Sequence, residues 1–386
     1  MLSDNKISGS IPPSISKLTS LSQLQLDTNQ ISGLIPLELG ELSKLAIFFA
    51  WKNQLEGSIP FSFSSLTSIQ AVDLSHNHLT SSIPPGLFLL QNLTKLLLLS
   101  NDISGAILLE IGQCRSLVSL RLGCDRIEGC IPLQIGGLAG INFLDLSSNR
   151  ITGTVPDEIG NGSHLQMLNI SNNILSGEPP ASLGSITSLL ILDASFNQFS
   201  RPIPDSLGKL ASMNKLIIEG NLLSGPIPSS LSRCLSLKLF DLSNNRLTSG
   251  IPNELCEIEG LDIALDLSRN ISILGKLSVL DLSYNNLDDS LAELPGLDNL
   301  ISLNVSNNTF TRCLPDTKLF HKLSASDLAG NEGFCTHDGD VCFVSSNANG
   351  VTSTTKESRR LHKLKLAIVL LIIVTVAMVL RMLGVI

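Results

Sequence analysis

The sequence predicts an α/β solenoid, in which short coils stack on one another and align their strands into one parallel sheet. Two observations support this. The segment L-x-L-x-x-N recurs along most of the 386 residues. Hydrophobic residues make up 43% of the chain and charged residues only 16%, a balance that suits short strands and turns. A single repeat cannot bury its apolar face alone, so stacking is required. We expect the solenoid to span residues 1–333.

The asparagine that ends each segment sets the repeat length. Asp125 stands in the register of the asparagines, so eleven successive positions lie 24 residues apart. Three further copies end at Asn270, Asn285 and Asn308, which gives fourteen copies in total. The first eleven are Asn5, Asn29, Asn53, Asn77, Asn101, Asp125, Asn149, Asn173, Asn197, Asn221 and Asn245.

The copy at 144–156, LDLSSNRITGTVP, shows the physical logic of one coil. Leu144 and Leu146 alternate with polar residues, as in a half-buried strand. Asn149 then turns inward, where its amide bonds backbone groups of neighbouring coils that would otherwise be buried unpaired. Gly153 permits a tight bend, and Pro156 stops regular pairing before the chain returns along the outside.

The extended unit LxxLxxLxLxxNxLxGxIPxxLGxL resembles the plant-specific class of leucine-rich repeat. LSQLQLDTNQISGLIPLELGELSKL and LQMLNISNNILSGEPPASLGSITSL carry it, and the resemblance covers nearly all of residues 1–333. The tail SLNVSNNTFTRCLPDTKLFHKLSASDLAGNEGFC is similar to the end of the ectodomain in plant leucine-rich-repeat receptor-like kinases. The group that binds root meristem growth factor peptides is the most similar. The resemblance implies a plant-type superhelix with its parallel sheet on the concave face.

Three departures from the repeat affect the expected fold. Asp125 replaces the recurrent asparagine, and a carboxylate buried there is costly unless it is paired or protonated. The step from Asn270 to Asn285 is only 15 residues, so we expect a kink or local disorder there. No signal peptide or cysteine-bearing cap precedes Met1, although members of the family carry both. We therefore expect a chain truncated at both ends.

The cysteines and sequons are consistent with a secreted domain. None of the eight cysteines forms a C-x-x-C pair and histidine is sparse, so we expect no zinc site. Cys335 and Cys342 lie just after the last repeat and are the expected disulfide, within a cap at 334–342. The expected glycosylation sites are Asn92, Asn161, Asn169, Asn304 and Asn307, with a sixth sequon at Asn270.

The C-terminal residues predict a membrane anchor. Residues 343–363 are a polar juxtamembrane linker, and 364–386 are the expected transmembrane helix. Its uncharged core, Leu366–Leu380, is about 22 Å long as a helix, shorter than a hydrocarbon core of roughly 30 Å. Arg381 can reach the headgroups if the helix tilts. A buried amphipathic helix is the alternative, although the segment is apolar all round.

The orientation of this anchor is contradictory. The basic residues precede the span, so the positive-inside rule alone places the repeats in the cytosol. The family resemblance places them outside, at the plasma membrane of a single-pass protein, with a kinase beyond the span. We adopt the family topology.

Composition and motifs disfavour several functions. The net charge of −8 and a pI near 5.3 disfavour a nucleic-acid partner, which needs a basic stripe. The sequence contains neither the Gly-rich, H-R-D and D-F-G motifs of a kinase nor a G-x-x-x-x-G-K-[ST] loop. We predict neither catalysis nor a cofactor.

The residues between and just after the core leucines should face the solvent on the concave side. Trp51, the single tryptophan, should be exposed there as a rigid anchor for a partner. Arg121 is the basic residue of this series between two core leucines and could hold a carboxylate or sulfate bidentately. The expected ligand-binding residues are Gln25, Asp27, Phe49, Trp51, Asp73, Arg121, Asp145, Asn169 and Asp193. The same face includes His76, Leu97, Leu99, Ile217, Glu219, Asp241 and Asp266.

We predict a membrane-anchored receptor ectodomain that is not itself an enzyme. The resemblance implies that an extracellular peptide binds the concave face, and that a co-receptor with a shorter repeat ectodomain docks around 280–330, near Tyr284. Signalling would then pass through a kinase or co-receptor outside this chain. The alternatives are a kinase-less receptor-like protein or decoy, and a secreted enzyme inhibitor built on the same repeat.

Overall fold

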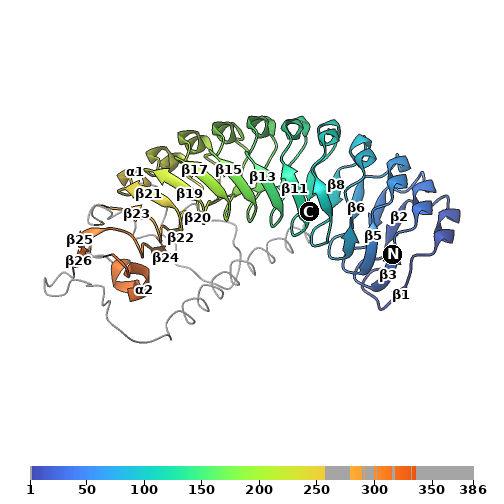
Figure 1. Cartoon of the computed structure of the whole chain (residues 1–386), viewed down its shortest axis with the longest axis horizontal. Coiled ribbons are helices and arrows are strands. Elements are labelled where there is room, and N and C mark those ends of the chain that lie inside the picture. Colours follow the sequence, from blue (N-terminus) through green and yellow to red (C-terminus); the bar gives the residue numbers. More distant parts are fainter. Residues whose placement is uncertain are drawn as a thin grey trace. The chain divides into compact units, whose positions relative to one another are not determined.

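The repeats form a solenoid whose coils lie side by side (Figure 1). The computed structural model describes residues 2–256, 279–288, 291, 300, 302–314, 318–331 and 333–335. In each regular coil a three-residue strand is followed by a turn, a second short strand and a 3-10 helix. Stacking at this period confirms the predicted parallel-sheet solenoid.

The principal sheet lines the concave side and contains twelve parallel strands in sequence order. Its register steps by 24 residues, so that Leu120 pairs with Leu96 and with Leu144. The strands are β2 (Gln23–Gln25), β4 (Ile47–Phe49), β6 (Ala71–Asp73), β8 (Lys95–Leu97), β10 (Ser119–Arg121), β12 (Phe143–Asp145), β14 (Met167–Asn169), β16 (Ile191–Asp193), β18 (Lys215–Ile217), β20 (Leu239–Asp241), β22 (Val279–Asp281) and β24 (Ser302–Asn304).

A second layer of parallel pairing follows the asparagine of each coil, and the sequence reasoning missed it. Gly153 at φ +79° ends strand β13 three residues before Pro156, so the proline caps a pairing that has already formed. One sheet contains β1 (Ser8–Gly9), β3 (Gln30–Leu34), β5 (Gln54–Ser58) and β7 (His78–Thr80). The other contains β9 (Ser104–Ala106), β11 (Arg126–Cys130), β13 (Arg150–Gly153), β15 (Ile174–Gly177), β17 (Gln198–Arg201), β19 (Leu222–Gly225), β21 (Arg246–Ser249) and β23 (Asn286–Leu287).

Short 3-10 helices return the chain on the side away from the concave sheet (Figure 1). Most begin directly after a proline in extended conformation, such as Pro36 (φ −64°), which fixes the entry angle. They are η1 (Pro13–Lys17), η2 (Leu37–Glu41), η3 (Phe61–Ser65), η4 (Pro85–Leu89), η5 (Leu109–Gln113), η6 (Leu133–Gly137), η7 (Asp157–Asn161), η8 (Ala181–Ser185), η9 (Asp205–Lys209), η10 (Ser229–Arg233) and η13 (Phe320–Lys322). Two single-turn α-helices are α1 (Asn253–Cys256) and α2 (Ala325–Leu328).

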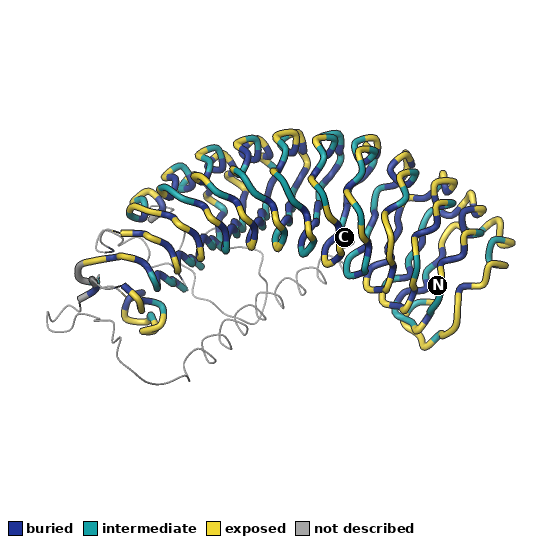
Figure 2. Tube along the Cα trace, viewed as in Figure 1, coloured by how far each residue is buried: buried dark blue, intermediate teal, exposed yellow. Residues whose placement is uncertain are grey.

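The core is one continuous apolar column between the strands and the 3-10 helices, visible as the dark interior of each coil in Figure 2. Leu144, Leu146, Ile159, Leu165 and Leu168 are all buried, as the alternation of the sequence predicts. Each complete burial of such a side chain stabilises the fold by about 1.5–3 kcal/mol.

The recurrent asparagines form an internal ladder. The Asn77 Nδ2 donates to the carbonyls of Ala50 and Leu74, both at 3.0 Å, and its Oδ1 accepts from the Leu55 amide at 2.9 Å. The same three contacts recur at Asn197, which confirms that the asparagines face inward. Because these backbone groups are buried, an alanine in place of one asparagine would leave them unpaired, at a cost of about 1–3 kcal/mol per group.

The predicted copy at Asn270 is not a rung of this ladder. Strand β20 pairs directly with β22, and the Asn285 Nδ2 donates to the Leu242 carbonyl at 3.1 Å. The coil of Asn285 therefore stacks on the coil of Asn245, and no intervening strand separates them. The kink expected at 270–285 lies largely outside the described residues.

The ladder instead gains a final rung at Asn331, which the sequence reasoning did not identify. Its Nδ2 donates to the carbonyls of Val305 (3.0 Å) and Leu328 (2.9 Å). Beside it, β25 (Thr311–Cys313) pairs with β26 (Gly333–Cys335), and the register aligns the backbones of Cys313 and Cys335. Cys342, the expected disulfide partner of Cys335, lies outside the described residues.

The expected anchor also lies outside the described part of the chain. Among the residues that the structure describes, none forms a helix with the length and apolar character needed to cross a bilayer. Neither the predicted linker at 343–363 nor the predicted span at 364–386 belongs to that part.

Candidate ligand-binding surface

The twelve strands of the principal sheet place a series of variable side chains on the concave face. In each strand the middle residue is a buried core residue, such as Leu24 or Leu144, and the residues on either side of it point the other way. Adjacent parallel strands lie about 4.8 Å apart, so equivalent side chains of successive coils contact one another. The variable positions therefore act as continuous rows along the sheet.

The rows are closer packed than the sequence suggested. Asp27 and Asp73 were expected to be exposed, but only 8% and 6% of their surface is accessible. Asp27 accepts a hydrogen bond from the Ser3 hydroxyl at 2.7 Å. Phe49 and Trp51 are half-buried for the same reason, since neighbours in the next coil cover part of each ring.

The N-terminal part of the face is apolar. We call Phe49 and Trp51 of the second coil, with Leu97 and Leu99 of the fourth, the apolar segment. The Lys52 ammonium lies 4.9 Å from the centre of the Trp51 ring, a cation–π distance that restrains the indole. A half-buried and restrained aromatic loses little further entropy when a partner binds, which suits it as an anchor.

Arg121 ends strand β10 between the apolar segment and the residues that follow. Its guanidinium lies 5.6 Å from the centre of the Phe143 ring in the next coil. Two residues later, Gly123 lets neighbouring side chains close in, because a Cβ there would lie 2.8 Å from the Ser147 hydroxyl oxygen and 3.1 Å from a Leu99 methyl. The arginine is thus held from one side and is the basic residue at the third strand position among the twelve described strands.

The C-terminal part of the face is acidic. We call Asp145, Asp193, Glu219, Asp241 and Asp281 the acidic segment. In each aspartate one carboxylate oxygen accepts the backbone amide of the serine two residues on, at 3.0 to 3.1 Å. In three of them the serine hydroxyl also donates to this oxygen, at 2.6 to 2.7 Å. The spacing Asp-x-Ser therefore fixes the carboxylates, a signal that the sequence reasoning overlooked.

Crowding of these carboxylates changes their protonation. Burial, with like charge from Asp281 and Asp193, raises the pKa of Glu219 to about 7, although Asn244 donates a hydrogen bond that opposes the shift. Burial, with like charge from Asp281 and Glu219, also raises the pKa of Asp241. Burial is the main cause of a raised pKa at Asp193 as well. A cationic group placed over this segment would be attracted and would favour the charged forms.

The predicted ligand-binding residues lie on one face but do not form one pocket. Gln25 and Asp27 lie at its first described strand, while Asp145, Asn169 and Asp193 lie on the neighbouring strands β12, β14 and β16. The residues at 217, 219 and 241 extend the row as expected, whereas Asp266 lies outside the described residues. Tyr284 is 56% exposed but lies in the turn after β22, off the sheet itself.

The predicted glycosylation sites fall in two environments. Asn92 and Asn161 are exposed at the ends of 3-10 helices, where a glycan has room. Asn169 and Asn304 lie in strands β14 and β24 of the concave sheet, and each accepts a bond from the serine of its own sequon. A glycan on Asn169 would occupy the face on which the same residue was expected to bind ligand. Asn307 is half-buried, in the turn after β24.

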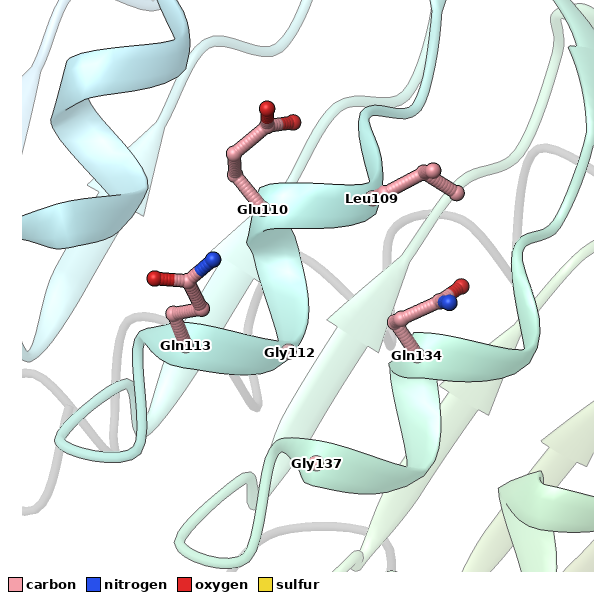
Figure 3. Close-up of a pocket in the computed structure, with 6 residues that line it drawn as sticks. All are labelled: Leu109, Glu110, Gly112, Gln113, Gln134 and Gly137. Atoms are coloured by element: carbon pink, nitrogen blue, oxygen red, sulfur yellow. The ribbon is translucent and has the colours of Figure 1, made fainter.

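A shallow pocket of about 380 Å³ opens on the other side of the coils, between η5 and η6 (Figure 3). Leu109, Glu110 and Gln113 line it from η5, and Gln134 lines it from η6. It spans only two coils and has one ionisable side chain. Among the described residues there is also no cluster of side chains that could hold a metal ion. The long concave face is therefore the stronger candidate.

Comparison with known proteins is consistent with this geometry. The sequence profile of the Leucine Rich Repeat family matches residues 1–18, 68–90, 140–161, 164–186, 188–210, 236–258 and 276–297. The chain is a leucine-rich-repeat protein. Its repeats are of the kind found in the ectodomains of plant leucine-rich-repeat receptor-like kinases. It is 55% identical over 113 residues to the LRR receptor-like serine/threonine-protein kinase RGI1 of Arabidopsis thaliana, covering 27% of this chain and 10% of that protein.

Solved structures of peptide receptors share the fold. The plant peptide hormone receptor RGFR1, solved in complex with RGF2, matches with 44% identity and a TM-score of 0.75 over 86% of this chain and 55% of the receptor. The ectodomain of the Arabidopsis receptor kinase HAESA, in complex with an IDA peptide hormone, matches with 32% identity and a TM-score of 0.79 over 88% of this chain and 54% of that one. The chain thus spans about half of these ectodomains, and the similarity concerns their repeat region.

Proposed function

We propose that this leucine-rich-repeat protein binds an extracellular peptide along its concave face, as the ectodomain part of a plant receptor. The single observation that carries the proposal is the concave row itself: an apolar segment, then Arg121, then an acidic segment, all on one rigid parallel sheet. The likeness to RGFR1 and HAESA, both solved with a peptide hormone, supports it.

The row indicates the chemistry of the ligand. Trp51 and its apolar neighbours suit side chains without charge, and Arg121 suits a carboxylate or sulfate held by two parallel hydrogen bonds. The acidic segment suits basic side chains, whose charge would reduce the repulsion among Glu219, Asp241 and Asp281. An extended peptide with these groups in sequence can contact many coils at once.

Membrane anchoring and partnership complete the proposal. The repeats face the exterior of the plasma membrane, carry glycans at exposed sequons, and are held by the apolar C-terminal segment. HAESA has been solved with the co-receptor SERK1 as well as with its peptide. By analogy, Tyr284 is a candidate contact for a co-receptor with a shorter repeat ectodomain, which supplies the signalling that this chain lacks.

A calorimetric titration tests peptide binding. The full chain, purified in detergent, is titrated with synthetic RGF2, with IDA as a second peptide and scrambled RGF2 as the control. Saturable binding of RGF2 or IDA at about one peptide per chain, with no response to the scrambled sequence, is expected. If neither peptide binds, or the scrambled peptide binds equally well, the proposal fails.

A further inference from the structure

Asp125 interrupts an otherwise uniform ladder of asparagines. Its Oδ1 accepts a hydrogen bond from the Ile103 amide at 2.9 Å, as the Asn149 Oδ1 does from Ile127 at 2.8 Å. Its other oxygen, Oδ2, is buried and has no hydrogen-bond partner among the described residues. Only 9% of the Asp125 surface is accessible, so water cannot readily replace the missing partner.

The register of the ladder shows what this oxygen faces. Each asparagine donates from Nδ2 to carbonyls 27 and 3 residues before it; Asn149, for example, donates to Leu122 at 2.7 Å and Leu146 at 3.1 Å. The equivalent carbonyls for Asp125 belong to Leu98 and Leu122. An ionised carboxylate has no hydrogen to donate to them, so acceptors would face acceptors. A protonated carboxyl can donate one hydrogen bond and close half of the rung.

The surrounding charges do not neutralise Asp125. On the preceding coil Asp102 repels it, and Arg126 of its own coil is committed to that same Asp102 in an ion pair of 2.5 Å. On the following coil the nearest basic residue in sequence register is Arg150, which lies beside Glu128. Burial and the repulsion by Asp102, against bonds from two backbone amides, raise the pKa of Asp125 to about 7.

We propose that Asp125 makes the junction between its own coil and the coil of Asn101 a pH-sensitive joint, closed when the carboxyl is protonated and loosened when it ionises. The joint lies in the coil that also carries Arg121, four residues earlier, so its state bears directly on the centre of the concave face. The inference does not depend on the proposed function, because it concerns the stability of the junction whatever the face binds.

The direction of the effect follows from linkage. Between the ordinary pKa of about 4 and the raised value, the folded junction holds a proton that the opened junction releases. The stability of the junction is therefore greatest in acid, and it decreases as the pH rises towards 7. For a shift of this size, the opening constant should rise about twentyfold between pH 5.5 and 7.5.

Peptide-resolved hydrogen exchange on the full chain tests the joint. The probe is the Ile103 amide, and the reference is the Ile151 amide, which makes the equivalent bond to Asn173 at 3.0 Å. In the unmodified chain the ratio of exchange at Ile103 to exchange at Ile151 should rise about twentyfold from pH 5.5 to 7.5. Taking the ratio removes the intrinsic pH dependence of exchange.

Two variants show whether Asp125 is the cause. Asp125→Asn restores the ladder residue, so the ratio should become independent of pH. Asn173→Asp transplants the joint, so exchange at Ile151 should acquire the pH dependence. A ratio that stays flat in the unmodified chain, or one that rises equally in Asp125→Asn, would overturn the proposal.

Discussion

The apolar and acidic segments of the concave face occupy the same positions of the same repeat, yet their chemistry is opposite. At the third strand position the second coil has Phe49 and the tenth has Asp241; two residues later the second coil has Trp51 and the tenth has Ser243. The backbone register is identical at both sites. The core residues and the ladder therefore specify the coil, while the variable positions can change without altering it.

The two segments also differ in their contribution to stability. Burying part of Trp51 against its neighbours is favourable in the free protein. Burying Glu219 beside Asp241 and Asp281 is unfavourable, because like charges are brought together in a region of reduced solvation. Such unfavourable clusters are typical of binding surfaces, where a partner supplies the missing charge.

The largest effect is expected at Arg121, which separates the two segments. Arg121→Ala should weaken binding of RGF2 about a hundredfold, if a charged group of the peptide lies there, because a charge-assisted bidentate contact contributes up to about 3 kcal/mol. Arg121→Lys keeps the charge without the planar fork and should lie between the two. Calorimetric titration at two salt concentrations measures both. Unchanged affinity in Arg121→Ala would mean that the ligand does not use this boundary.

A smaller effect is expected in the apolar segment. Trp51→Ala should weaken binding of the same peptide by about 2 kcal/mol, or roughly thirtyfold, because aromatic anchors dominate interfaces of this kind. Ser171 occupies the same register position five coils later, between the strands of Asp145 and Asp193, so Ser171→Ala is the matched control and should change affinity less than threefold. Equal losses in the two variants would contradict the distinction between the segments.

Much of the fold could be predicted from the sequence because its determinants are periodic. Apolar residues at a fixed spacing indicate both the strand and the packed face, and the inward asparagines follow from the backbone groups that a coil leaves unpaired. The second sheet was missed because residues such as Arg150–Gly153 lack strong alternation and gain their pairing only from the neighbouring coil. Asn270 was miscounted because a local motif does not show which coils stack.

The chemistry of the face was less predictable. Burial of Asp73 and Glu219 depends on contacts between coils that are 24 or more residues apart, and single-strand alternation gives no information about them. The Asp-x-Ser spacing was visible in the sequence, but its hydrogen bonds follow only once the strand ends at the aspartate. The fold is thus encoded in short-range periodicity, and the electrostatics in contacts between coils.

The smallest effect tests whether the acidic segment weakens the free protein. Since burial and like charge raise the pKa of Glu219 to about 7 from an ordinary value near 4.5, the folded state holds a proton that the unfolded state releases between these values. The stability of the unmodified chain should therefore fall as the pH rises from about 4.5 to 7. Glu219→Gln removes this dependence, so at pH 8 it should be more stable than the unmodified chain by about 1–2 kcal/mol, with little difference at pH 4. Thermal unfolding by calorimetry at both pH values measures it, and Glu158→Gln, an exposed glutamate of η7, is the control. If Glu219→Gln shows no gain at pH 8, or if Glu158→Gln shows the same gain, the acidic segment is not a source of instability, and the contrast with the apolar segment would lie in ligand chemistry alone.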